Sequence, residues 1–297
     1  ILIVGATGFL GFKFAKKYLK KKYQVTSLSR NKPTKQRFLK EVKYLYADIS
    51  KKKFLKNKLS ENFNYIVNFA GDVDHHGKNT FKSHFNGCKN LADIFKKREI
   101  KKFIQIGSSV EYANQKVPHI ENKSPPKIRV LKSVYAKAKL SSSNYLLDLF
   151  CTSKFPVTIF RPYLVYGPGQ DQNRLIPHVI KNCLDDKTFP CSNGKQYRDF
   201  VYIDDAINLI FKALNSTKAD GEIFNLCSGK PIKVRNVINQ IRKEIRKGKP
   251  KFGEISLRKD EVLRFYGNPK KAIRFFKYTP KVTFLKGLKK TIKYFRT

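Results

Sequence analysis

The opening eleven residues, ILIVGATGFLG, constrain the fold of this chain more than any other stretch. Four consecutive aliphatic residues predict a strand that is buried on both faces, and the amphipathic residues 12–22 predict a helix. Gly5, Gly8 and Gly11 lie between the two. In such a turn the bare backbone comes close to a ligand, and the first N–H groups of the helix point at an anion. The stretch therefore predicts a dinucleotide site, with a purely structural glycine turn as the alternative.

Strand-like and helix-like stretches alternate through the first half of the chain. Strands are predicted at residues 24–28, 42–46, 65–69, 103–106 and 157–160, and helices at 79–98 and 133–150. This alternation predicts an α/β fold, a Rossmann-type doubly wound parallel sheet with helices on both faces. Ligands of such sheets bind beyond the carboxyl ends of the strands, where Asp48, the segment 68–71 and Ser108 fall.

The pattern changes after Arg161, where prolines and glycines interrupt it and the following elements become shorter. We expect residues 1–161 to form an NAD(P)-binding Rossmann domain and residues 162–297 to form a smaller α/β portion that binds the substrate. No repeat or low-complexity linker marks the boundary, so elements of the two parts can interleave.

The net charge of +41 arises from 63 Lys and Arg residues against 22 Asp and Glu residues. Such a balance fits nucleic-acid binding, attraction to an anionic membrane surface, or solvated lysines in a lysine-rich proteome. The lysines are spread over nearly every segment in short runs, such as residues 20–22 and 51–53, without a recognised nucleic-acid motif. We therefore favour solvated lysines and expect no nucleic-acid partner.

The five cysteines are Cys88, Cys151, Cys183, Cys191 and Cys227. Their number is odd and their spacing matches neither paired thiols nor zinc ligands, so we expect a reducing compartment, no disulfide framework and no metal. No apolar run approaches the roughly 20 residues that a membrane-spanning helix needs, and no signal peptide precedes the first strand. The sequence thus predicts a soluble, cytoplasmic protein.

Tyr135 and Lys139 are four residues apart in a predicted helix, which places them on one face. A nearby cation stabilises a phenolate and lowers the pKa of a tyrosine from about 10, so Tyr135 is a candidate proton donor or acceptor. A solvated helix face is the alternative for this pair. Ser108 follows the fifth strand, where its hydroxyl can donate to a carbonyl oxygen or simply satisfy loop backbone.

Eight motifs occur in a familiar order along the chain. They are Gly5/Gly8/Gly11, Asp48-Ile49, Asn68 to Gly71, Asn86, Ser108 to Tyr112, Tyr135/Lys139, Arg161-Pro162 with Tyr166-Gly167-Pro168, and Arg198 to Asp205. Together they resemble the extended short-chain dehydrogenase/reductases of the sugar-nucleotide epimerase/dehydratase type. The resemblance runs from Ile1 almost to the C-terminus. It implies an NADP or NAD cofactor, a nucleoside-diphosphate sugar as substrate, and a homodimer as an open possibility.

The resemblance also implies roles for individual residues. Ser108, Tyr135 and Lys139 are the implied catalytic residues, with the tyrosine as acid and base. The implied cofactor contacts are Gly5, Thr7, Gly8, Phe9, Leu10, Gly11, Ser29, Arg30, Asp48, Ile49, Phe69, Ala70, Gly71, Asn86, Tyr135, Lys139 and Pro162. The implied substrate contacts are Ser108, Ser109, Arg198 and Arg258, with the arginines on the pyrophosphate. An ordinary surface position is the alternative for Arg258.

Departures from the family pattern bear on the reaction. Dehydratases carry an Asp-Glu pair directly after the catalytic hydroxyl residue, whereas this chain has Ser109 and Val110, which disfavours dehydration. The second strand ends in Ser29-Arg30 instead of an acid, which favours NADP over NAD. Leu164 lies where the family often has an asparagine, which puts one usual substrate contact in doubt.

Three functions remain open at this point. The stretch from Gly167 to Arg198 and residues 258–261 resemble bacterial 4-keto-6-deoxy sugar-nucleotide reductases, so we favour NADPH-dependent reduction at sugar C4. An NAD-dependent C4 epimerase of the UDP-glucose type is the alternative. A nucleotide- or RNA-binding protein without catalysis is a third, because a fold does not determine a function; the intact Ser108, Tyr135 and Lys139 set favours an enzyme.

Overall fold

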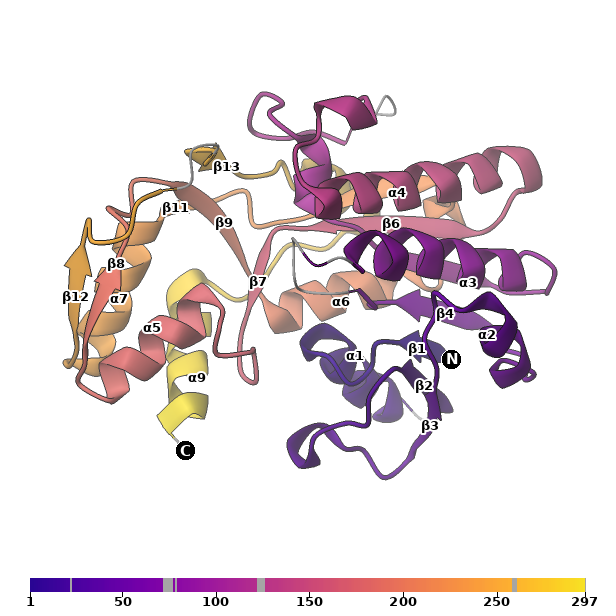
Figure 1. Cartoon of the computed structure of the whole chain (residues 1–297), viewed down its shortest axis with the longest axis horizontal. Helices are drawn as coiled ribbons and strands as arrows, with labels where there is room; N and C mark the ends of the chain where they lie inside the picture. The colour runs from indigo at the N-terminus through magenta and orange to yellow at the C-terminus, as the bar shows by residue number, and fades with distance from the viewer. Residues whose placement is uncertain (22, 72–76, 78, 122–125, 258–260, 297) are drawn as a thin grey trace. The chain divides into compact units, whose positions relative to one another are not determined.

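The computed structural model describes residues 1–21, 23–71, 77, 79–121, 126–257 and 261–296 (Figure 1). The chain divides into two compact units. The first comprises Ile1–Ala113, Glu121–Pro162 and Ile207–Phe224, and the second comprises Asn114–Ile120, Tyr163–Ala206 and Asn225–Thr297. The chain thus leaves and re-enters each unit.

A seven-stranded sheet forms the centre of the first unit. Its strands are β1 (Leu2–Val4), β2 (Val25–Ser29), β3 (Val42–Tyr46), β4 (Tyr65–Asn68), β5 (Lys102–Ile106), β6 (Val157–Pro162) and β10 (Glu222–Leu226), in the order β10-β6-β5-β4-β1-β2-β3. Strands β1 to β6 pair in parallel throughout. The order reverses between β1 and β4, and such a reversal opens a crevice at the carboxyl ends of the strands.

Helices cover this sheet. They are α1 (Phe9–Leu19), α2 (Lys52–Lys58), α3 (Gly87–Phe95), α4 (Val134–Ser153) and the part of α6 (Ile203–Ala213) that belongs to this unit. Helix α1 contacts α6 through the rings of Tyr18 and Phe211, whose centroids are 5.2 Å apart. Helices α2 and α3 contact each other, and α3 and α4 lie side by side (Figure 1). The predicted Rossmann-type α/β fold is confirmed.

Short helical turns complete the unit: the 3-10 turns η1 (Lys35–Arg37), η3 (Ser109–Tyr112), η4 (Ile128–Val130) and η5 (Thr217–Ala219), and the π-helical turn η2 (Lys82–Asn86). The helix predicted over residues 79–98 is therefore interrupted, because η2 precedes α3 and packs against α4. Helix α1 begins at Phe9 rather than at the predicted residue 12, since Gly11 belongs to the helix and not to the turn.

The second unit is built on a smaller sheet. Its strands are β7 (Leu164–Tyr166), β9 (Tyr197–Tyr202), β11 (Pro231–Lys233) and β13 (Arg264–Phe265), and a separate pair joins β8 (Thr188–Cys191) to β12 (Lys249–Phe252). Its helices are α5 (Leu175–Leu184), α7 (Val234–Ile245), α8 (Lys270–Phe276) and α9 (Phe284–Arg296). Its core includes the ring of Tyr166, which contacts Phe200, Tyr202 and Phe284.

Two acids of the segment 198–205 hold the second unit together. Asp199 accepts hydrogen bonds from the backbone of Ser228 and Gly229. Asp205 accepts from the Tyr278 hydroxyl and from the N–H of Lys281. Both acids are buried, and these hydrogen bonds from donors of their own unit compensate for the loss of contact with water.

Strand β10 lies beyond residue 162 in sequence but belongs to the sheet of the first unit. Elements from either side of the predicted boundary therefore occur in one sheet. The boundary at residues 161 and 162 stays a prediction about domains, because compactness alone does not show which parts fold independently.

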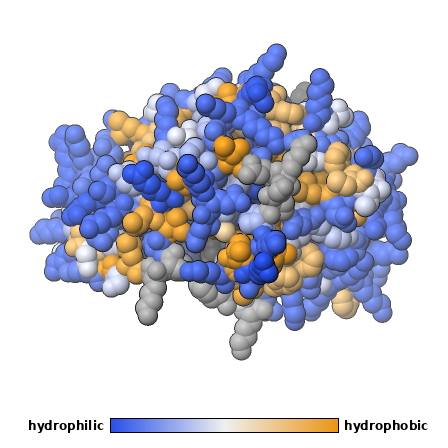
Figure 2. All heavy atoms as spheres, turned by 90° about the horizontal axis from the view of Figure 1, so that it is seen from above, coloured by the Kyte–Doolittle hydropathy of each residue, from blue (hydrophilic) through white to orange (hydrophobic). Residues whose placement is uncertain are grey.

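Hydrophilic residues cover most of the face in Figure 2, and hydrophobic residues appear there in small groups. This agrees with lysines that are spread along the sequence rather than gathered in one block. Among the helices in the described part of the chain, none combines the length and the hydropathy that crossing a bilayer requires.

The burial of the cysteines gives a test of the fold. Cys151 is exposed, whereas Cys88, Cys183, Cys191 and Cys227 are buried. Burial raises the pKa of the Cys88 thiol to about 12 and that of Cys183 to about 11. Because the thiolate is the nucleophile, we predict that iodoacetamide at about pH 8 modifies Cys151 and spares the buried thiols of the native protein.

Mass spectrometry of tryptic peptides measures this pattern, and protein in concentrated guanidinium chloride, where all five thiols should react, is the control. Modification of native Cys88 as fast as Cys151 would contradict the packing described above.

Candidate active site

The glycine turn between β1 and α1 is so tightly closed that a side chain does not fit at Gly5 or at Gly11. Gly5 has a φ of +82°, and a Cβ there would lie 3.0 Å from the backbone nitrogen of Ala70. A Cβ on Gly11 would lie 2.2 Å from the carbonyl oxygen of Gly5. The Gly8 N–H donates to that same oxygen at 3.0 Å. Helix α1 therefore begins directly on the turn, and its first N–H groups face the carboxyl ends of the strands.

A pocket opens beside this turn at the carboxyl ends of β1 to β4. It is lined by Val4, Gly5, Thr7, Gly8, Leu28, Ser29, Arg30, Asn31, Ala47, Asp48, Ile49, Phe69, Ala70, Gly71 and Ser83. Most of the predicted cofactor contacts are among them. Phe9, Leu10 and Gly11 lie instead in α1, and Asn86, Tyr135, Lys139 and Pro162 lie on other elements of the same unit.

Several lining residues escaped the sequence analysis. Asn31 follows the predicted contact Arg30, and Ala47 precedes the predicted contact Asp48, so their positions next to these residues could have indicated them. Ser83 lies in η2, and no local pattern places it near the glycine turn. Arg37 of η1 was also missed; its Nη1 donates to the carbonyl oxygen of Thr7 at 3.1 Å.

The end of β2 carries a polar group that lacks a partner. Ser29 is buried, and its hydroxyl has no hydrogen-bond partner among the residues that the structure describes. An unpaired buried hydroxyl is costly, so a ligand with a polar group at this position would compensate it. With the bare turn of Gly5 and the guanidinium of Arg30 in the same pocket, the residues fit a dinucleotide.

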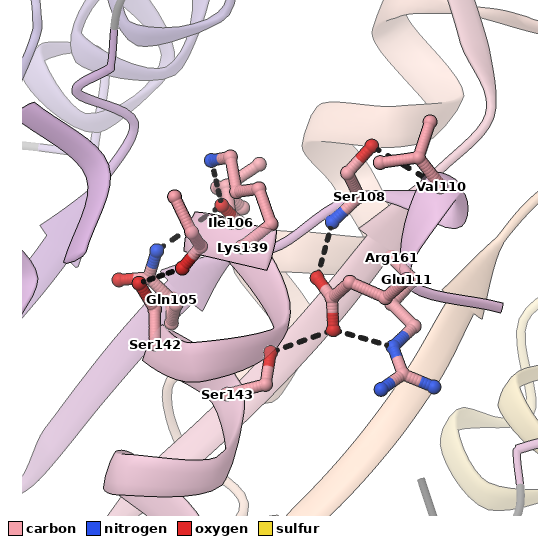
Figure 3. Close-up of polar contacts among 10 residues, drawn as sticks. Gln105, Ile106, Ser108, Val110, Glu111, Lys139, Ser142, Ser143 and Arg161 are labelled. Atoms are coloured by element: carbon pink, nitrogen blue, oxygen red, sulfur yellow. Dashed lines mark hydrogen bonds and ion pairs between the residues drawn. The ribbon is translucent and has the colours of Figure 1, made fainter. Parts of the chain in front are cut away.

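Tyr135 and Lys139 both lie in the first turns of α4. The helix begins after Ser133, whose hydroxyl accepts from the N–H of Ala136 at 3.1 Å. The Lys139 Nζ lies 5.9 Å from the centroid of the Tyr135 ring. It also donates to the carbonyl oxygen of Ile106 at 2.7 Å (Figure 3). Because Ile106 ends β5, this hydrogen bond fixes the start of α4 beside the end of that strand.

Ser108 follows β5 by two residues and caps the turn η3. Its hydroxyl accepts from the N–H of Val110 at 3.4 Å, and its own N–H donates to the carboxylate of Glu111 at 2.7 Å (Figure 3). Among the described residues its hydroxyl serves as an acceptor, so the hydroxyl hydrogen can be donated to a ligand oxygen. Ser109 is buried next to it.

Glu111 forms a buried ion pair with Arg161, the residue before the end of β6. The Arg161 Nε lies 2.9 Å from Oε2 of Glu111, and the guanidinium stacks on the ring of Tyr112 at 4.6 Å. Burial lowers the pKa of Arg161, but the charge of Glu111 and the contact with Tyr112 outweigh it and hold that pKa above its ordinary value. Arg161 thus keeps its positive charge beside Glu111.

The predicted pyrophosphate ligands lie in the second unit or outside the described residues. Arg198 lies on β9, where its Nη1 donates to the carbonyl oxygens of Tyr197 and Val262 at 2.8 Å each, and its Nη2 pairs with Glu261. Burial lowers the pKa of Arg198 below its ordinary value, against the opposing effect of Glu261. Arg258 lies outside the described residues, so its role stays a prediction, as does that of Arg198.

Within the described residues, no cluster of three or more His, Cys, Asp or Glu side chains could hold a metal ion.

Comparison with known proteins identifies the family. Residues 1–227 of this chain match the sequence model of the family described as "NAD dependent epimerase/dehydratase family". The chain belongs to this family. The resemblance inferred from the eight motifs is confirmed.

Relatives in the family differ in their named activities. A UDP-glucuronate 4-epimerase of Thermodesulfobacterium geofontis is 29% identical over 213 residues, which are 71% of this chain and 64% of that protein. A CDP-abequose synthase of Salmonella muenchen is 27% identical over 168 residues, which are 53% of this chain and 56% of that protein. The matches thus span less than two thirds of these relatives.

The fold extends over the whole chain. The crystal structure of a UDP-glucose 4-epimerase of Thermotoga maritima, solved with UDP-glucose, superimposes with a TM-score of 0.92 and covers 99% of this chain and 98% of that one. The two sequences are 24% identical, so this likeness shows a shared fold.

The glycine turn gives a second test. We predict that Gly11→Ala weakens NADPH binding at least tenfold and lowers the free energy of unfolding by about 1–3 kcal/mol, because the added methyl group collides with backbone that cannot move away. Gly8→Ala, whose Cβ would lie 3.3 Å from the Gly5 oxygen, is the matched control for stability and should lower the free energy of unfolding less.

Fluorescence titration with NADPH and urea denaturation measure the two quantities. Equal losses of unfolding free energy in the Gly11 and Gly8 variants would show that the turn is less closed than described.

Proposed function

We propose that this chain is an NAD(P)-dependent enzyme that acts at C4 of a nucleoside-diphosphate sugar. The observation that carries the proposal is the hydrogen bond from Lys139 to the carbonyl oxygen of Ile106. It brings the helix that carries Tyr135 to the strand end that leads into Ser108. Tyr135 as a proton donor, Lys139 as a cation and Ser108 as a hydroxyl donor therefore lie in the unit that contains the dinucleotide pocket.

Each side chain has a distinct role in the proposal. The Ser108 hydroxyl donates a hydrogen bond to the carbonyl oxygen at sugar C4. Tyr135 transfers its phenolic proton to that oxygen as the carbonyl becomes an alcohol, and solvent then restores the proton. The positive charge of Lys139, 5.9 Å from the ring centroid, stabilises the phenolate.

The pocket residues would hold the cofactor. The glycine turn and the start of α1 would accept the pyrophosphate, and Asp48 and Ile49 would line the adenine end. When bound, a nicotinamide cofactor supplies the two electrons and the hydrogen that reduce sugar C4, or accepts them in the reverse direction. Ser29 and Arg30 would contact the 2′-phosphate of NADP, because the strand end presents a guanidinium and an unpaired hydroxyl instead of an acid.

Reduction of a 4-keto-6-deoxy sugar nucleotide is our first assignment. The basic end of β2 and the likeness to CDP-abequose synthase support it. C4 epimerisation is the second candidate, supported by the likeness to UDP-glucuronate 4-epimerase. Both reactions need the same three side chains and differ in whether the cofactor leaves between turnovers.

Dehydration is not proposed, although dTDP-D-glucose 4,6-dehydratases are among the relatives. The positions after Ser108 hold Ser109 and Val110, which provide neither an acid nor a base. The nearby carboxylate of Glu111 accepts hydrogen bonds from Ser108, Ser143 and Arg161 and is fully buried.

Two parallel assays test the function. NADPH oxidation is followed with a panel of 4-keto-6-deoxy sugar nucleotides, and C4 inversion is followed with UDP-glucose and UDP-glucuronate. Turnover in the first assay supports a reductase, and turnover in the second supports an epimerase. Salt-sensitive retention of RNA without turnover in either assay would contradict both and favour a binding protein.

The phenol of Tyr135 provides a mutational test of the proposed function. We predict that Tyr135→Phe lowers kcat by about 10²–10⁴-fold, because the proton donor is lost, while NADPH affinity changes little. Tyr145→Phe removes a hydroxyl from the same helix, where it contacts Asp93, and should keep most of the activity. Steady-state kinetics with NADPH titrations compare the two, and an active Tyr135→Phe enzyme would refute the assignment.

Arg30 provides a second mutational test of the proposed function. We predict that Arg30→Ala weakens NADPH binding about 10–100-fold, as expected for a lost charge-assisted hydrogen bond, and changes NADH binding little. Calorimetric titration with both nucleotides measures this, and NADH acts as the internal control. Equal losses for the two nucleotides would exclude contact between Arg30 and a 2′-phosphate.

A further inference from the structure

Glu111 is a carboxylate without solvent exposure that connects three elements of the first unit (Figure 3). Its Oε1 accepts the N–H of Ser108 at 2.7 Å. Its Oε2 accepts the hydroxyl of Ser143 in α4 at 2.7 Å and the Nε of Arg161 in β6 at 2.9 Å. The loop after β5 is thus tied to a helix and to a strand by one side chain.

The contact with Ser143 matters because of its place in α4. Ser143 follows Lys139 by four residues, so both lie on the same face of the helix. Lys139 binds the carbonyl oxygen of Ile106, and Ser143 binds the carboxylate that holds the N–H of Ser108. The helix with Tyr135 is therefore connected to the strand end on both sides of Gly107.

The backbone around Ser108 is shaped to receive this carboxylate. A Cβ on Gly107 would lie 2.4 Å from Oε1 of Glu111 and 3.2 Å from the carbonyl oxygen of Phe160. A side chain at position 107 would push the carboxylate away from the N–H of Ser108. The absence of a side chain at Gly107 thus leaves the space that the carboxylate of Glu111 occupies.

Stability is a weak explanation for such a pair. Removing a carboxylate and a guanidinium from water costs several kcal/mol, and apolar replacements of buried ion pairs are commonly neutral or stabilising. The pair does supply a fixed direction, because a carboxylate with three donors from three elements has one geometry that satisfies them all. This geometry also fixes the position of the Ser108 N–H, which donates to the same carboxylate.

We propose that Glu111, held by Arg161 and Ser143, is a positioning residue that fixes Ser108 relative to Tyr135 and Lys139. The proposal rests on the proposed function in one respect, namely that Ser108 and Tyr135 act on the same oxygen. Because Glu111 has no solvent exposure, it acts through the backbone of Ser108 and not by direct contact with a ligand.

Two charge-free double variants separate positioning from stability. In Glu111→Gln with Arg161→Met, the amide oxygen still accepts the N–H of Ser108 and the amide nitrogen can donate to the hydroxyl of Ser143. In Glu111→Leu with Arg161→Met, no acceptor remains. Neither variant leaves a buried charge unpaired, so the comparison isolates the acceptor.

Amide hydrogen exchange of residues 107–113, measured without ligand, reads out the position directly. We expect the leucine variant to exchange at least about tenfold faster there than the glutamine variant, as for a lost buried hydrogen bond, with equal exchange in β5. In the assays that show wild-type turnover, kcat should fall about tenfold or more in the leucine variant only, at similar KM and similar NADPH affinity. Equal exchange and equal kcat in the two variants would overturn the proposal.

Single serine variants decide the matter if either double variant fails to fold. Ser143→Ala removes a donor to Glu111, whereas Ser142→Ala removes an equally buried hydroxyl that donates to the carbonyl oxygens of Ala138 and His84. We expect faster exchange at residues 107–113 and a lower kcat for Ser143→Ala alone. Identical effects of the two would contradict the proposal.

The proposed function and this inference fail separately. A wild-type protein without turnover in any assay would refute the function, while the exchange comparison would still show whether Glu111 holds the loop of Ser108.

Discussion

The first unit depends on the close approach of backbone at the end of β1. The carbonyl oxygen of Gly5 lies only 2.2 Å from the position that a Cβ of Gly11 would take. Gly5 itself packs against the backbone of Ala70, which follows β4. With this contact, α1 begins on the turn, and β1 lies between β2 and β4, where the strand order reverses. The crevice follows from that reversal, and the turn provides N–H groups at its edge.

A second constraint lies at the end of β5. Lys139 and Ser143 of α4 reach the strand end through the carbonyl of Ile106 and the carboxylate of Glu111. These two connections place the phenol of Tyr135 and the hydroxyl of Ser108 in one neighbourhood although they are 27 residues apart in the sequence. The chemistry of the family requires groups from different elements at one atom, and buried polar contacts fix such groups more rigidly than apolar packing does.

The sequence predicted what depends on local pattern. The aliphatic runs of β1 and β4, the glycine spacing and the helix around Tyr135 follow from periodicity and turn chemistry, and the parallel sheet was confirmed. The roles of Ser108 and Lys139 came from resemblance to a family. The start of α1 was predicted three residues late, because Gly11 looked like a turn residue, and its place in the helix follows from contact with Gly5.

Tertiary contacts explain what the sequence could not provide. The π-helical turn η2 interrupts a continuous amphipathic pattern where it meets α4, and Arg37 reaches Thr7 across 30 residues. The sequence around Glu111 did not single out this residue. It contacts Ser143 and Arg161, which follow it by 32 and 50 residues, so no short window of the sequence contains the three residues.

The most direct test of the central claim follows an isotope. NADPH that carries deuterium at both positions of nicotinamide C4 is incubated with the protein and the 4-keto sugar nucleotide that it turns over, and the product is examined by NMR. The account predicts deuterium at C4 of the sugar, since Ser108 and Tyr135 hold the oxygen of that carbon. Turnover with deuterium at another carbon, or with none in the sugar, would contradict it.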